Sequence, residues 1–559
     1  MEMLASGLIL SRQRLLASRA LAAALLFAAL LAPAHAATRP DTPTNAMGEA
    51  IYRRGVAGSG APLEAAREAG MRMQGAAAAC VNCHRRSGFG AKEGKSVVPP
   101  ITGRYLFRPR VPRAEDVDVP YVAGMRGDRE PYTDATLARS IRDGVDSEGK
   151  PLSYLMPRYA LNDADMAALI DYLKRLDQRR VPGVTDKLLH FATIITPDAD
   201  PVKRRGMLDV LEQYFAERNA RQMSPAPRLR TSRVIEFMVH RRWQLHVWEL
   251  TGPEAAWQEQ LERYLAKQPV FAVVSGLGGR TWAPVHAFCE RAAVPCLFPN
   301  VEVPVGTDRD FYSLYFSKGL LLEAELIANR ILDAGSGQAA KAVRQIYRAG
   351  DSGEAGAEAL AAALKRDGIK ASSQALARGA PGQGLAEALR EAATADALVL
   401  WLRPADVAAL GNAPAAPAAV FMSGLMGGLE RSPLPSSWRG RTRLAYPFDL
   451  PERRRVRVSY AFGWFAIRKI PVVAEQLQAD TFLACGLLSE TLDHMADTFV
   501  LDYLVERIQD MLEHRILTGY YPRLTLATGQ RFASKGGYIV RFSEPQGTRL
   551  IADRDWFVP

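Results

Sequence analysis

The chain has 559 residues, a formal net charge of +11 and 48% hydrophobic residues, and this length predicts two to four folding units rather than one. Its basic residues are scattered along the chain, whereas a nucleic-acid-binding surface needs a concentrated stripe, so a nucleic-acid partner is not expected. The scattered charge favours an ordinary solvated basic surface, with docking to an acidic redox partner as the alternative.

The N-terminus has the pattern of a secretory signal peptide. Arg12, Arg14 and Arg19 precede the apolar run Ala20–Leu31, which is followed by an A-x-A site ending at Ala36. The apolar run is short for a membrane span, and no later stretch is long and apolar enough for one. We therefore expect residues 1–36 to be removed near Ala36, a periplasmic location, and no membrane span afterwards.

The five residues from Cys80 to His84 read C-V-N-C-H, the signature of covalent haem attachment. Two thiols must reach two vinyl groups of one porphyrin, and an imidazole must lie under the iron. On a helix Cys80 and Cys83 are three residues apart and His84 is four from Cys80, so all three share one face. The pentad predicts one covalent haem c, with His84 as an iron ligand.

Three other interpretations of the pentad stay open. A structural zinc site needs a fourth ligand at close spacing, and none is near in the sequence. A redox dithiol suits a thioredoxin-like strand–helix context, whereas this pentad follows four alanines and precedes Arg85 and Arg86. A simple disulfide is the third, because an exported protein meets an oxidising compartment.

Residues 45–178 resemble a class I c-type cytochrome domain. The segment Gly48–Tyr52 is similar to the N-terminal helix of that family, in which a glycine and an aromatic ring pack against the closing helix. A helix is expected over Thr133–Asp143, and a closing helix over Asn162–Leu176, with Asn162 as N-cap. The resemblance implies an all-α domain.

The resemblance also implies a sixth iron ligand. In class I cytochromes it is a methionine in a loop, often followed by proline, and Met156-Pro157 matches that pattern. A His/Met pair raises the reduction potential, and a filled sixth position favours electron transfer. Met125 is the rival ligand. The family's proline carbonyl that accepts from the proximal imidazole has a loose match in Pro99 or Pro100, which ordinary loop prolines would also explain.

Arg158 and Tyr159, next to the expected methionine ligand, are candidates to reach the haem propionates. Residues 179–186 are expected to form a linker, since the polar run ends in Pro182-Gly183.

From residue 187 to 559 the pattern changes to alternating strands and helices. This alternation predicts parallel α/β sheets, and the length predicts two lobes. The expected strands are Leu188–Ile195, Trp243–Leu250, Val270–Val274, Val294–Phe298, Ala342–Tyr347 and Ala397–Leu402, and the expected helices are Pro201–Phe215, Glu254–Leu265, Trp282–Ala292, Gly353–Lys365 and Leu385–Ala393.

The order of these elements resembles type I periplasmic solute-binding proteins, the group of the branched-chain amino-acid receptors. The resemblance rests on Val274–Thr281, Val294–Asn300, Phe311–Phe316 and the ending from Gly529 to Pro559. It implies a two-lobed α/β domain of the kind that supplies substrates to ABC transporters, with a small carboxylate or amino-acid-like ligand between the lobes.

A Gly-rich turn that opens a helix offers free N–H groups to a carboxylate at the carboxyl ends of the strands. The candidate ligand-binding residues are accordingly Thr196, Ser275, Gly276, Arg280 and Thr281. A tight turn without ligand is the alternative.

Other reactive residues give weaker indications. Cys289 and Cys296 are candidates for a disulfide, and Cys485 reads as a buried thiol. His190, His240, His246 and His286 show no metal spacing, and hydrolase and nucleotide motifs are missing from the sequence.

The sequence thus favours a periplasmic single-haem electron carrier, not an enzyme, with a solute-binding-like domain for docking onto a redox partner or for sensing. The alternative is a solute receptor with an accessory haem. A haem peroxidase would need an open sixth iron position.

Overall fold

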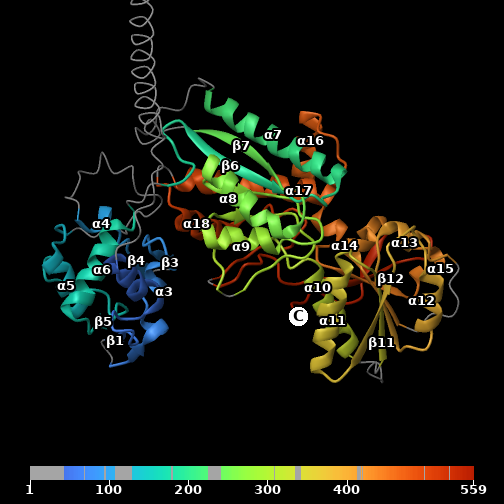
Figure 1. Ribbon diagram of the computed structural model, residues 1–559, viewed down its shortest axis with the longest axis horizontal. Helices are drawn as coiled ribbons and strands as arrows, with labels where there is room; N and C mark the ends of the chain where they lie inside the picture. The colour runs from blue at the N-terminus through green and yellow to red at the C-terminus, as the bar shows by residue number, and fades with distance from the viewer. Residues whose placement is uncertain are drawn as a thin grey trace, which may run out of the picture.

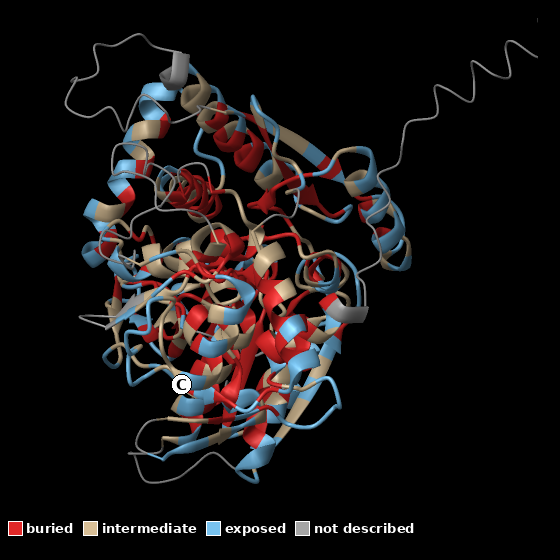
Figure 2. Ribbon diagram, turned by 90° about the vertical axis from the view of Figure 1, so that its left-hand side faces the viewer, coloured by how far each residue is buried: buried red, intermediate tan, exposed pale blue. Residues whose placement is uncertain are grey.

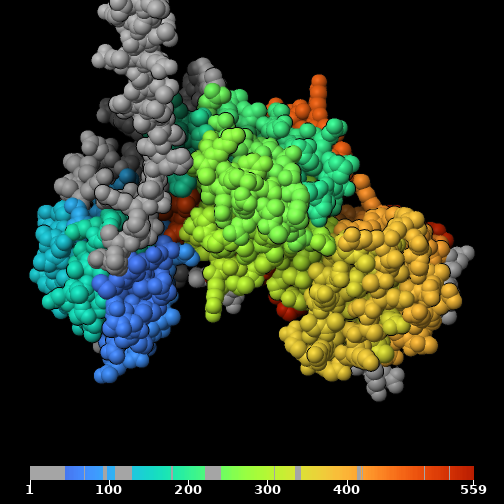
Figure 3. Space-filling view, viewed as in Figure 1, coloured from blue at the N-terminus to red at the C-terminus, as the bar shows by residue number. Residues whose placement is uncertain are grey.

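The computed structural model describes residues 43–67, 70–93, 96–107, 129–177, 181–223, 241–307, 309–333, 342–411, 417, 419–495, 498–527 and 529–559. The expected signal peptide, linker positions 179 and 180, Met125 and His240 lie outside the described residues. Figure 1 shows a small N-terminal unit beside a first α/β lobe, with a second α/β lobe on the other side of the first. The same three masses are distinct in the space-filling view of Figure 3.

The N-terminal unit is built from short helices and very short strands. Its strands form an antiparallel sheet in the order β2-β1-β5 and the hairpin β3-β4. The expectation of an all-α domain is therefore not met in detail, because the connecting loops pair their backbones over two or three residues. The elements are α2 (Pro43–Glu49), η1 (Ala50–Arg54), β1 (Glu64–Ala66), β2 (Arg72–Gln74), η2 (Gly75–Ala78), α3 (Val81–His84), β3 (Ala91–Glu93), β4 (Ser96–Val98), α4 (Gly103–Phe107), α5 (Asp134–Asp143), β5 (Arg158–Tyr159) and α6 (Asp163–Arg175).

A close crossing of α2 and α6 holds this unit together. A Cβ atom on Gly48 would lie 2.2 Å from the carbonyl oxygen of Ala168, so only glycine fits there. One turn later the rings of Tyr52 and Tyr172 pack 5.3 Å apart. The expected contact between the N-terminal and closing helices is confirmed.

The helix boundaries in this unit follow local capping. The side chain of Asn162 accepts a hydrogen bond from the backbone N–H of Asp165, as expected of an N-cap. Thr133 caps α5 in the same way, through the N–H of Thr136. Both helices begin and end within one residue of the expected positions.

The first lobe contains a five-stranded sheet in the order β10-β9-β8-β6-β7, in which all pairs are parallel. Each expected strand and helix is present, although β8 and β9 are shorter than expected and α7 continues for eight further residues. The elements are β6 (Leu188–Ile195), α7 (Pro201–Met223), β7 (Arg242–Glu249), η5 (Glu254–Ala256), α8 (Trp257–Lys267), β8 (Ala272–Val274), α9 (Ala283–Ala292), β9 (Cys296–Leu297) and β10 (Ser313–Leu314).

The second lobe contains a seven-stranded sheet in the order β12-β11-β13-β14-β15-β16-β17, parallel except for the last two strands. Figure 2 shows its central strands as buried. The elements are α10 (Leu320–Leu332), β11 (Ala342–Arg348), α11 (Gly353–Arg366), β12 (Lys370–Leu376), α12 (Leu385–Ala392), β13 (Ala397–Trp401), α13 (Pro404–Ala408), β14 (Ala419–Ser423), α14 (Gly424–Gly427), η6 (Leu429–Arg431), α15 (Ser436–Arg439), β15 (Thr442–Tyr446), β16 (Tyr538–Phe542) and β17 (Leu550–Ala552).

After β15 the chain returns to the first lobe through three helices, α16 (Pro451–Arg468), α17 (Glu475–Met495) and α18 (Leu501–His514). Helix α17 packs along α7, and residues of both belong to one hydrophobic core. The chain then re-enters the second lobe at β16. The expected two-lobed α/β architecture with parallel sheets is therefore present. None of the described helices combines the length and hydropathy that crossing a bilayer requires.

The α2–α6 crossing gives a first prediction. Gly48→Ala places a methyl group against a backbone carbonyl and should destabilise the N-terminal unit by about 1–3 kcal/mol or more, as overpacking does. Differential scanning calorimetry of the full-length protein measures the loss. Gly463→Ala is the matched control: that glycine lies in α16 with nothing within 4 Å of its added Cβ, so alanine should leave stability unchanged or raise it. Equal unfolding temperatures for the two variants would contradict the tight crossing of α2 and α6.

Candidate functional site

The C-x-x-C-H pentad forms one helical turn. Cys80 precedes α3, and its carbonyl oxygen accepts from the N–H of Cys83 at 3.2 Å and of His84 at 2.9 Å. Both cysteines are half-buried, whereas the His84 side chain is buried, with 5% of the residue exposed. The turn therefore brings two half-buried cysteines and one buried imidazole into five consecutive positions.

The His84 ring is oriented by a backbone carbonyl. Its Nδ1 lies 3.1 Å from the carbonyl oxygen of Pro99. A carbonyl only accepts, so Nδ1 carries the hydrogen and Nε2 keeps a free lone pair. Burial lowers the pKa of His84 to about 4, although the Pro99 contact opposes this shift. The ring is thus neutral near pH 7, which metal ligation requires, and the expected role of Pro99 as acceptor is confirmed.

Met156 lies in a turn that precedes β5. Its N–H donates to the carbonyl oxygen of Ser153 at 2.9 Å, and its partly buried side chain packs against the hydrophobic core of the N-terminal unit. The two residues before it are exposed, Tyr154 by 68% and Leu155 by 39%. Ligation of iron by Met156 stays a prediction.

The residues after Met156 serve packing roles near the pentad. The Tyr159 hydroxyl donates to the carbonyl oxygen of Ala78 at 3.0 Å, two residues before Cys80. Burial raises the pKa of Tyr159 well above its ordinary value, and the neighbouring Cys80 adds to the shift. Arg158 is exposed and packs against Gly144. The Tyr159 hydroxyl is already used, so contact with a propionate is not needed to explain its position.

The geometry of the pentad does not suit a small ion. Among the described residues, one set of three His, Cys, Asp or Glu side chains has ligand atoms within 4.8 Å of one another, and it is His286, Glu290 and Asp310 in the first lobe. The thiols and the imidazole of the pentad do not meet this condition.

The cluster in the first lobe has internal partners instead. The Glu290 carboxylate accepts three backbone N–H groups, from Phe311, Tyr312 and Ser313. His286 contacts the Tyr315 hydroxyl at 2.9 Å through Nδ1 and Asp310 at 3.2 Å through Nε2. These contacts tie α9 to β10, and they account for the cluster without a metal. The sequence spacing did not indicate this grouping.

The candidate ligand-binding turn is closed by residues of its own lobe. The Thr196 hydroxyl accepts from the N–H of Gly279 at 2.9 Å and donates to Asp198 at 2.7 Å. The other Asp198 oxygen accepts from the N–H of Arg280 at 2.8 Å. The Arg280 side chain is exposed and pairs with Glu254 at 2.7 Å. Two N–H groups of the turn are thus already occupied within the chain, that of Arg280 by the Asp198 carboxylate and that of Gly279 by the Thr196 hydroxyl.

The other candidates lie at the same edge of the first sheet. Ser275 is buried with a φ of 53°, and its hydroxyl accepts from the Asn300 amide at 2.8 Å and lies 3.3 Å from the Thr481 hydroxyl on α17. Gly276 has a φ of 142°, with Trp282 2.9 Å from where its Cβ would be. Thr281 is partly buried, and its hydroxyl accepts from the N–H of Ala283, the first residue of α9, at 3.3 Å. The structure brings these residues together, and ligand binding by them stays a prediction.

A charged cluster of Arg403, Glu302 and Asp351 lies at the edge of the second lobe, and the sequence did not predict it. Arg403, after β13, forms two hydrogen bonds with Glu302, at 2.7 and 2.6 Å, and two with Asp351. Burial alone would raise the pKa of Glu302, but Arg403 outweighs it, and the pKa falls to about 2. Lys203 of α7 lies 3.5 Å from Glu302 and so links this cluster to the first lobe. Each residue follows a strand or opens a helix, but the pairing depends on long-range contacts that sequence spacing does not encode.

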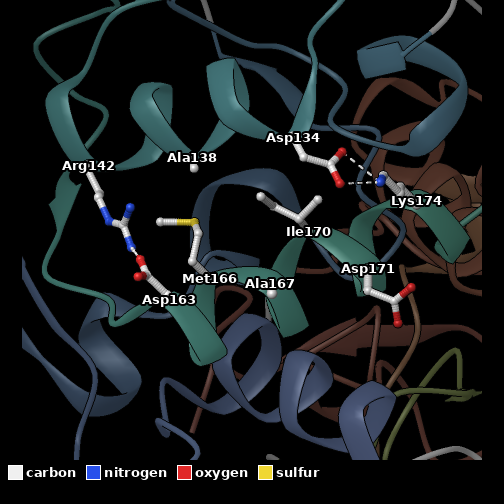
Figure 4. A pocket seen from close by; sticks show the side chains of 9 residues that line it. All are labelled: Asp134, Ala138, Arg142, Asp163, Met166, Ala167, Ile170, Asp171 and Lys174. Atoms are coloured by element: carbon white, nitrogen blue, oxygen red, sulfur yellow. Dashed lines mark hydrogen bonds and ion pairs between the residues drawn. The ribbon is translucent and has the colours of Figure 1, made fainter.

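A shallow hollow of about 320 Å³ lies between α5 and α6 (Figure 4). Met166 and Ile170 form its apolar floor, and ion pairs close its ends, Arg142 with Asp163 and Lys174 with Asp134. It does not include the pentad or Met156, so it is separate from the expected haem site.

Residues 74–177 match the family model for cytochrome c, a range that holds the pentad, Met156 and α6. The chain therefore carries a cytochrome c domain, as the resemblance in its sequence predicts. No curated protein matches the chain.

Solved structures similar to the chain include substrate-binding proteins of ABC transporters. The fatty acid ABC transporter substrate-binding protein from Thermomonospora curvata is 14% identical, with a TM-score of 0.47, over 68% of this chain and 95% of its own. A branched chain amino acid ABC transporter from Thermus thermophilus with bound valine is 11% identical, with a TM-score of 0.47, over 67% and 97%. An extracellular ligand-binding receptor from Verminephrobacter eiseniae is 16% identical, with a TM-score of 0.46, over 65% and 99%.

The buried thiols lie as expected for core residues. Cys485 is buried in α17, and burial raises the pKa of its thiol well above the ordinary value. Cys289 of α9 and Cys296 of β9 are free, buried thiols; burial raises the pKa of Cys289, and the neighbouring Cys296 adds to the shift. A disulfide between them stays a prediction.

Two histidines that the sequence leaves scattered meet on the first sheet. Nδ1 of His190 on β6 lies 3.0 Å from Nε2 of His246 on β7, and the rings stack. Burial lowers the pKa of both rings, and for His246 the charge of His190 lowers it further. The folded state therefore binds fewer protons than the unfolded state near the ordinary histidine pKa of 6.5, so protonation opposes folding.

This pair gives a second prediction. The free energy of unfolding should fall as the pH drops through 6.5 toward 5, and His246→Gln should make that fall smaller. Urea unfolding between pH 5 and 8 measures it. His514→Gln, at the exposed end of α18, should keep the pH dependence of the wild-type protein. An unchanged slope in His246→Gln would show that the pair does not couple folding to pH.

Proposed function

We propose that the protein is a c-type cytochrome that carries single electrons through one haem c bound covalently at Cys80 and Cys83. The orientation of His84 is the observation that carries this proposal: the last residue of the pentad is buried, neutral, and fixed by Pro99 with Nε2 free. The match of residues 74–177 to the cytochrome c family supports it independently. A bare dithiol would not need this ring orientation.

The residues of the chain would divide the work as follows. The thiols of Cys80 and Cys83 would hold the macrocycle by thioether bonds, and His84 would be one ligand of the iron. Met156 would be the other, and its thioether would favour Fe(II) and keep other molecules off the metal. The haem supplies a one-electron Fe(III)/Fe(II) couple. The protein sets its potential through these ligands and the hydrogen bond to Pro99.

The two-lobed domain serves docking onto a redox partner or sensing in this proposal. If the domain senses a solute, a small carboxylate or an amino acid is the first candidate. A cytochrome with covalent haem and a secretory signal peptide would function in the periplasm. The internal closure of the Gly279–Arg280 turn by Thr196 and Asp198 favours docking over tight binding of a carboxylate at that turn.

The optical spectrum tests the haem and its ligands together. A pyridine haemochrome assay on purified full-length protein should give one haem c per chain. Met156→Ala should remove the methionine–iron charge-transfer band of the ferric protein, because the sixth ligand is lost. Met125→Ala is the control and should keep the band. The opposite result would assign the ligand to Met125, and a ferric wild-type protein without the band would favour a peroxidase with an open iron position.

Calorimetry separates the electron carrier from the alternative, a solute receptor with an accessory haem. Titration of the full-length protein with valine, isoleucine and acetate should show no tight, specific binding, since Asp198 fills the anion position of the turn. Asp198→Ala frees the N–H group of Arg280 and should raise the affinity for acetate. Tight binding of one amino acid by the wild-type protein would support the receptor instead.

A further inference from the structure

The segment that follows the C-x-x-C-H pentad packs against helix α18, more than 400 positions away in sequence. Helix α18 belongs to the two-lobed, receptor-like domain (residues 187–559). Figure 1 places α18 on the side of the first lobe that faces the N-terminal unit. Asp502, Glu506 and Asp510 follow one another at four-residue intervals, so they lie on one face of α18. All three carboxylates bind groups of the cytochrome domain.

The residue directly after the iron ligand has an unusual backbone. Arg85 has a φ of 60° and a ψ of 176°, a region that residues other than glycine rarely adopt. Two contacts hold it there. Its carbonyl oxygen accepts from the Tyr52 hydroxyl at 2.7 Å, and its guanidinium donates twice to Asp510, at 3.1 and 3.0 Å. One of these contacts belongs to the cytochrome domain and the other to α18.

Glu506 binds the next two residues. One carboxylate oxygen accepts from the backbone N–H of Arg86 at 2.8 Å and of Ser87 at 3.1 Å. The other accepts from the Ser87 hydroxyl at 2.5 Å, and that hydroxyl in turn accepts from the N–H of Phe89 at 3.2 Å. Glu506 and Ser87 are both buried. The acceptor that completes this turn is therefore supplied by the other domain.

The turn is hydrogen-bonded both to His84 itself and to the loop that carries its acceptor, Pro99. The N–H of Gly90 donates to the carbonyl oxygen of His84 at 3.1 Å, and the N–H of Ile101 donates to that of Gly88 at 2.8 Å. Pro99, the acceptor for the imidazole, lies between these points. A shift of residues 85–90 therefore moves His84 relative to Pro99.

Further contacts fix α18 and its neighbours against the cytochrome domain. Arg53 donates to Asp502 at 2.8 Å, and the other oxygen of Asp502 accepts from the Tyr312 hydroxyl at 2.6 Å. The Arg86 guanidinium lies over the Phe311 ring at 4.1 Å, and the rings of Phe89 and Tyr503 pack 4.6 Å apart. The contact is thus a packed interface rather than a single ion pair.

We propose that α18 of the receptor-like domain clamps the strained turn after His84, so that Glu506 and Asp510 are positioning residues for the proximal side of the haem. The receptor-like domain then helps to set the reduction potential without touching the iron ligands. This inference rests on the proposed function, because it assumes that His84 binds haem iron. It gives that function a definite structural route between the two domains.

The test measures the potential of full-length holoprotein by spectroelectrochemistry. Glu506→Gln keeps the shape of the side chain but replaces one of its two acceptor oxygens with a donor N–H₂ group. Either the Ser87 hydroxyl or the two backbone N–H groups then lose their acceptor, so the turn should move and the Pro99 hydrogen bond weaken. A less electron-rich imidazole stabilises Fe(III) less, and the potential should rise. At a fixed applied potential near the midpoint, the Fe(II)/Fe(III) ratio should increase by roughly threefold to tenfold, tenfold being about 59 mV for one electron.

Two further variants guard the result. Asp510→Asn loosens the partly exposed end of the clamp, should raise the potential less, and serves if Glu506→Gln does not fold. Glu513→Gln is the matched control, since Glu513 is exposed on the same helix, and it should leave the potential unchanged.

A second comparison separates mechanical clamping from the loss of a negative charge. Arg85→Gly relieves the backbone strain, because glycine adopts positive φ freely. Glu506→Gln should therefore shift the potential less in the Arg85→Gly background than in the wild-type background. Equal shifts in both backgrounds would overturn the clamp, since charge alone would then explain them.

The outcomes also separate this inference from the proposed function. Hydrogen exchange at the amides of Arg86 and Ser87 should be faster in Glu506→Gln than in the wild-type protein, with or without haem. A haem-binding wild-type protein whose potential and exchange are unchanged in Glu506→Gln and Asp510→Asn would overturn the clamp and leave the electron carrier intact. If the wild-type protein binds no haem, yet Glu506→Gln still shows faster exchange than wild type, the clamp is supported and the proposed function is contradicted.

Discussion

The hydrogen bond from His84 to the Pro99 carbonyl is the interaction on which the haem site depends. Burial of an unpaired imidazole would leave two nitrogens without partners, at a cost of about 1–3 kcal/mol for each unsatisfied group. The structure satisfies Nδ1 with a backbone carbonyl at 3.1 Å and leaves Nε2 for a metal. Because the acceptor comes from the loop after β4, the position of that loop decides the direction in which the ring points. The described residues 85–93 and 96–101 are therefore part of the site.

Local patterns were sufficient for the pentad, the helix caps and most strands, since each depends on residues within a few positions. Asn162 caps α6 because its partner lies three residues ahead. The contacts that the sequence did not predict join residues far apart in the chain. Nothing in the spacing of His190 and His246 indicates that β6 and β7 would bring their rings to 3.0 Å. The pairing of Glu506 with Ser87 joins positions 419 apart, and only the folded chain shows it.

The candidate ligand turn illustrates a different limit. A Gly-rich turn that opens a helix offers N–H groups to an anion, and the sequence predicts that much correctly. It does not say which anion is nearest. Asp198 lies two residues after Thr196, so the chain itself brings a carboxylate to the turn at an effective concentration that a free solute does not reach. A Gly-rich turn at the start of a helix can therefore be present while a carboxylate of the same chain already occupies its N–H group.

At the contact between the two domains, the buried hydrogen bonds to Glu506 contribute more stability than the partly exposed ion pairs. Partly exposed ion pairs such as that of Arg85 with Asp510 contribute about 0–1 kcal/mol. The backbone conformation of Arg85 costs about 1–3 kcal/mol, so that pair alone does not hold it. Removing Glu506 would leave two backbone N–H groups and a hydroxyl unpaired, at about 1–3 kcal/mol each. The strained turn after His84 thus takes its buried acceptor from α18 of the other domain, which is the physical basis of the proposed coupling between the two domains.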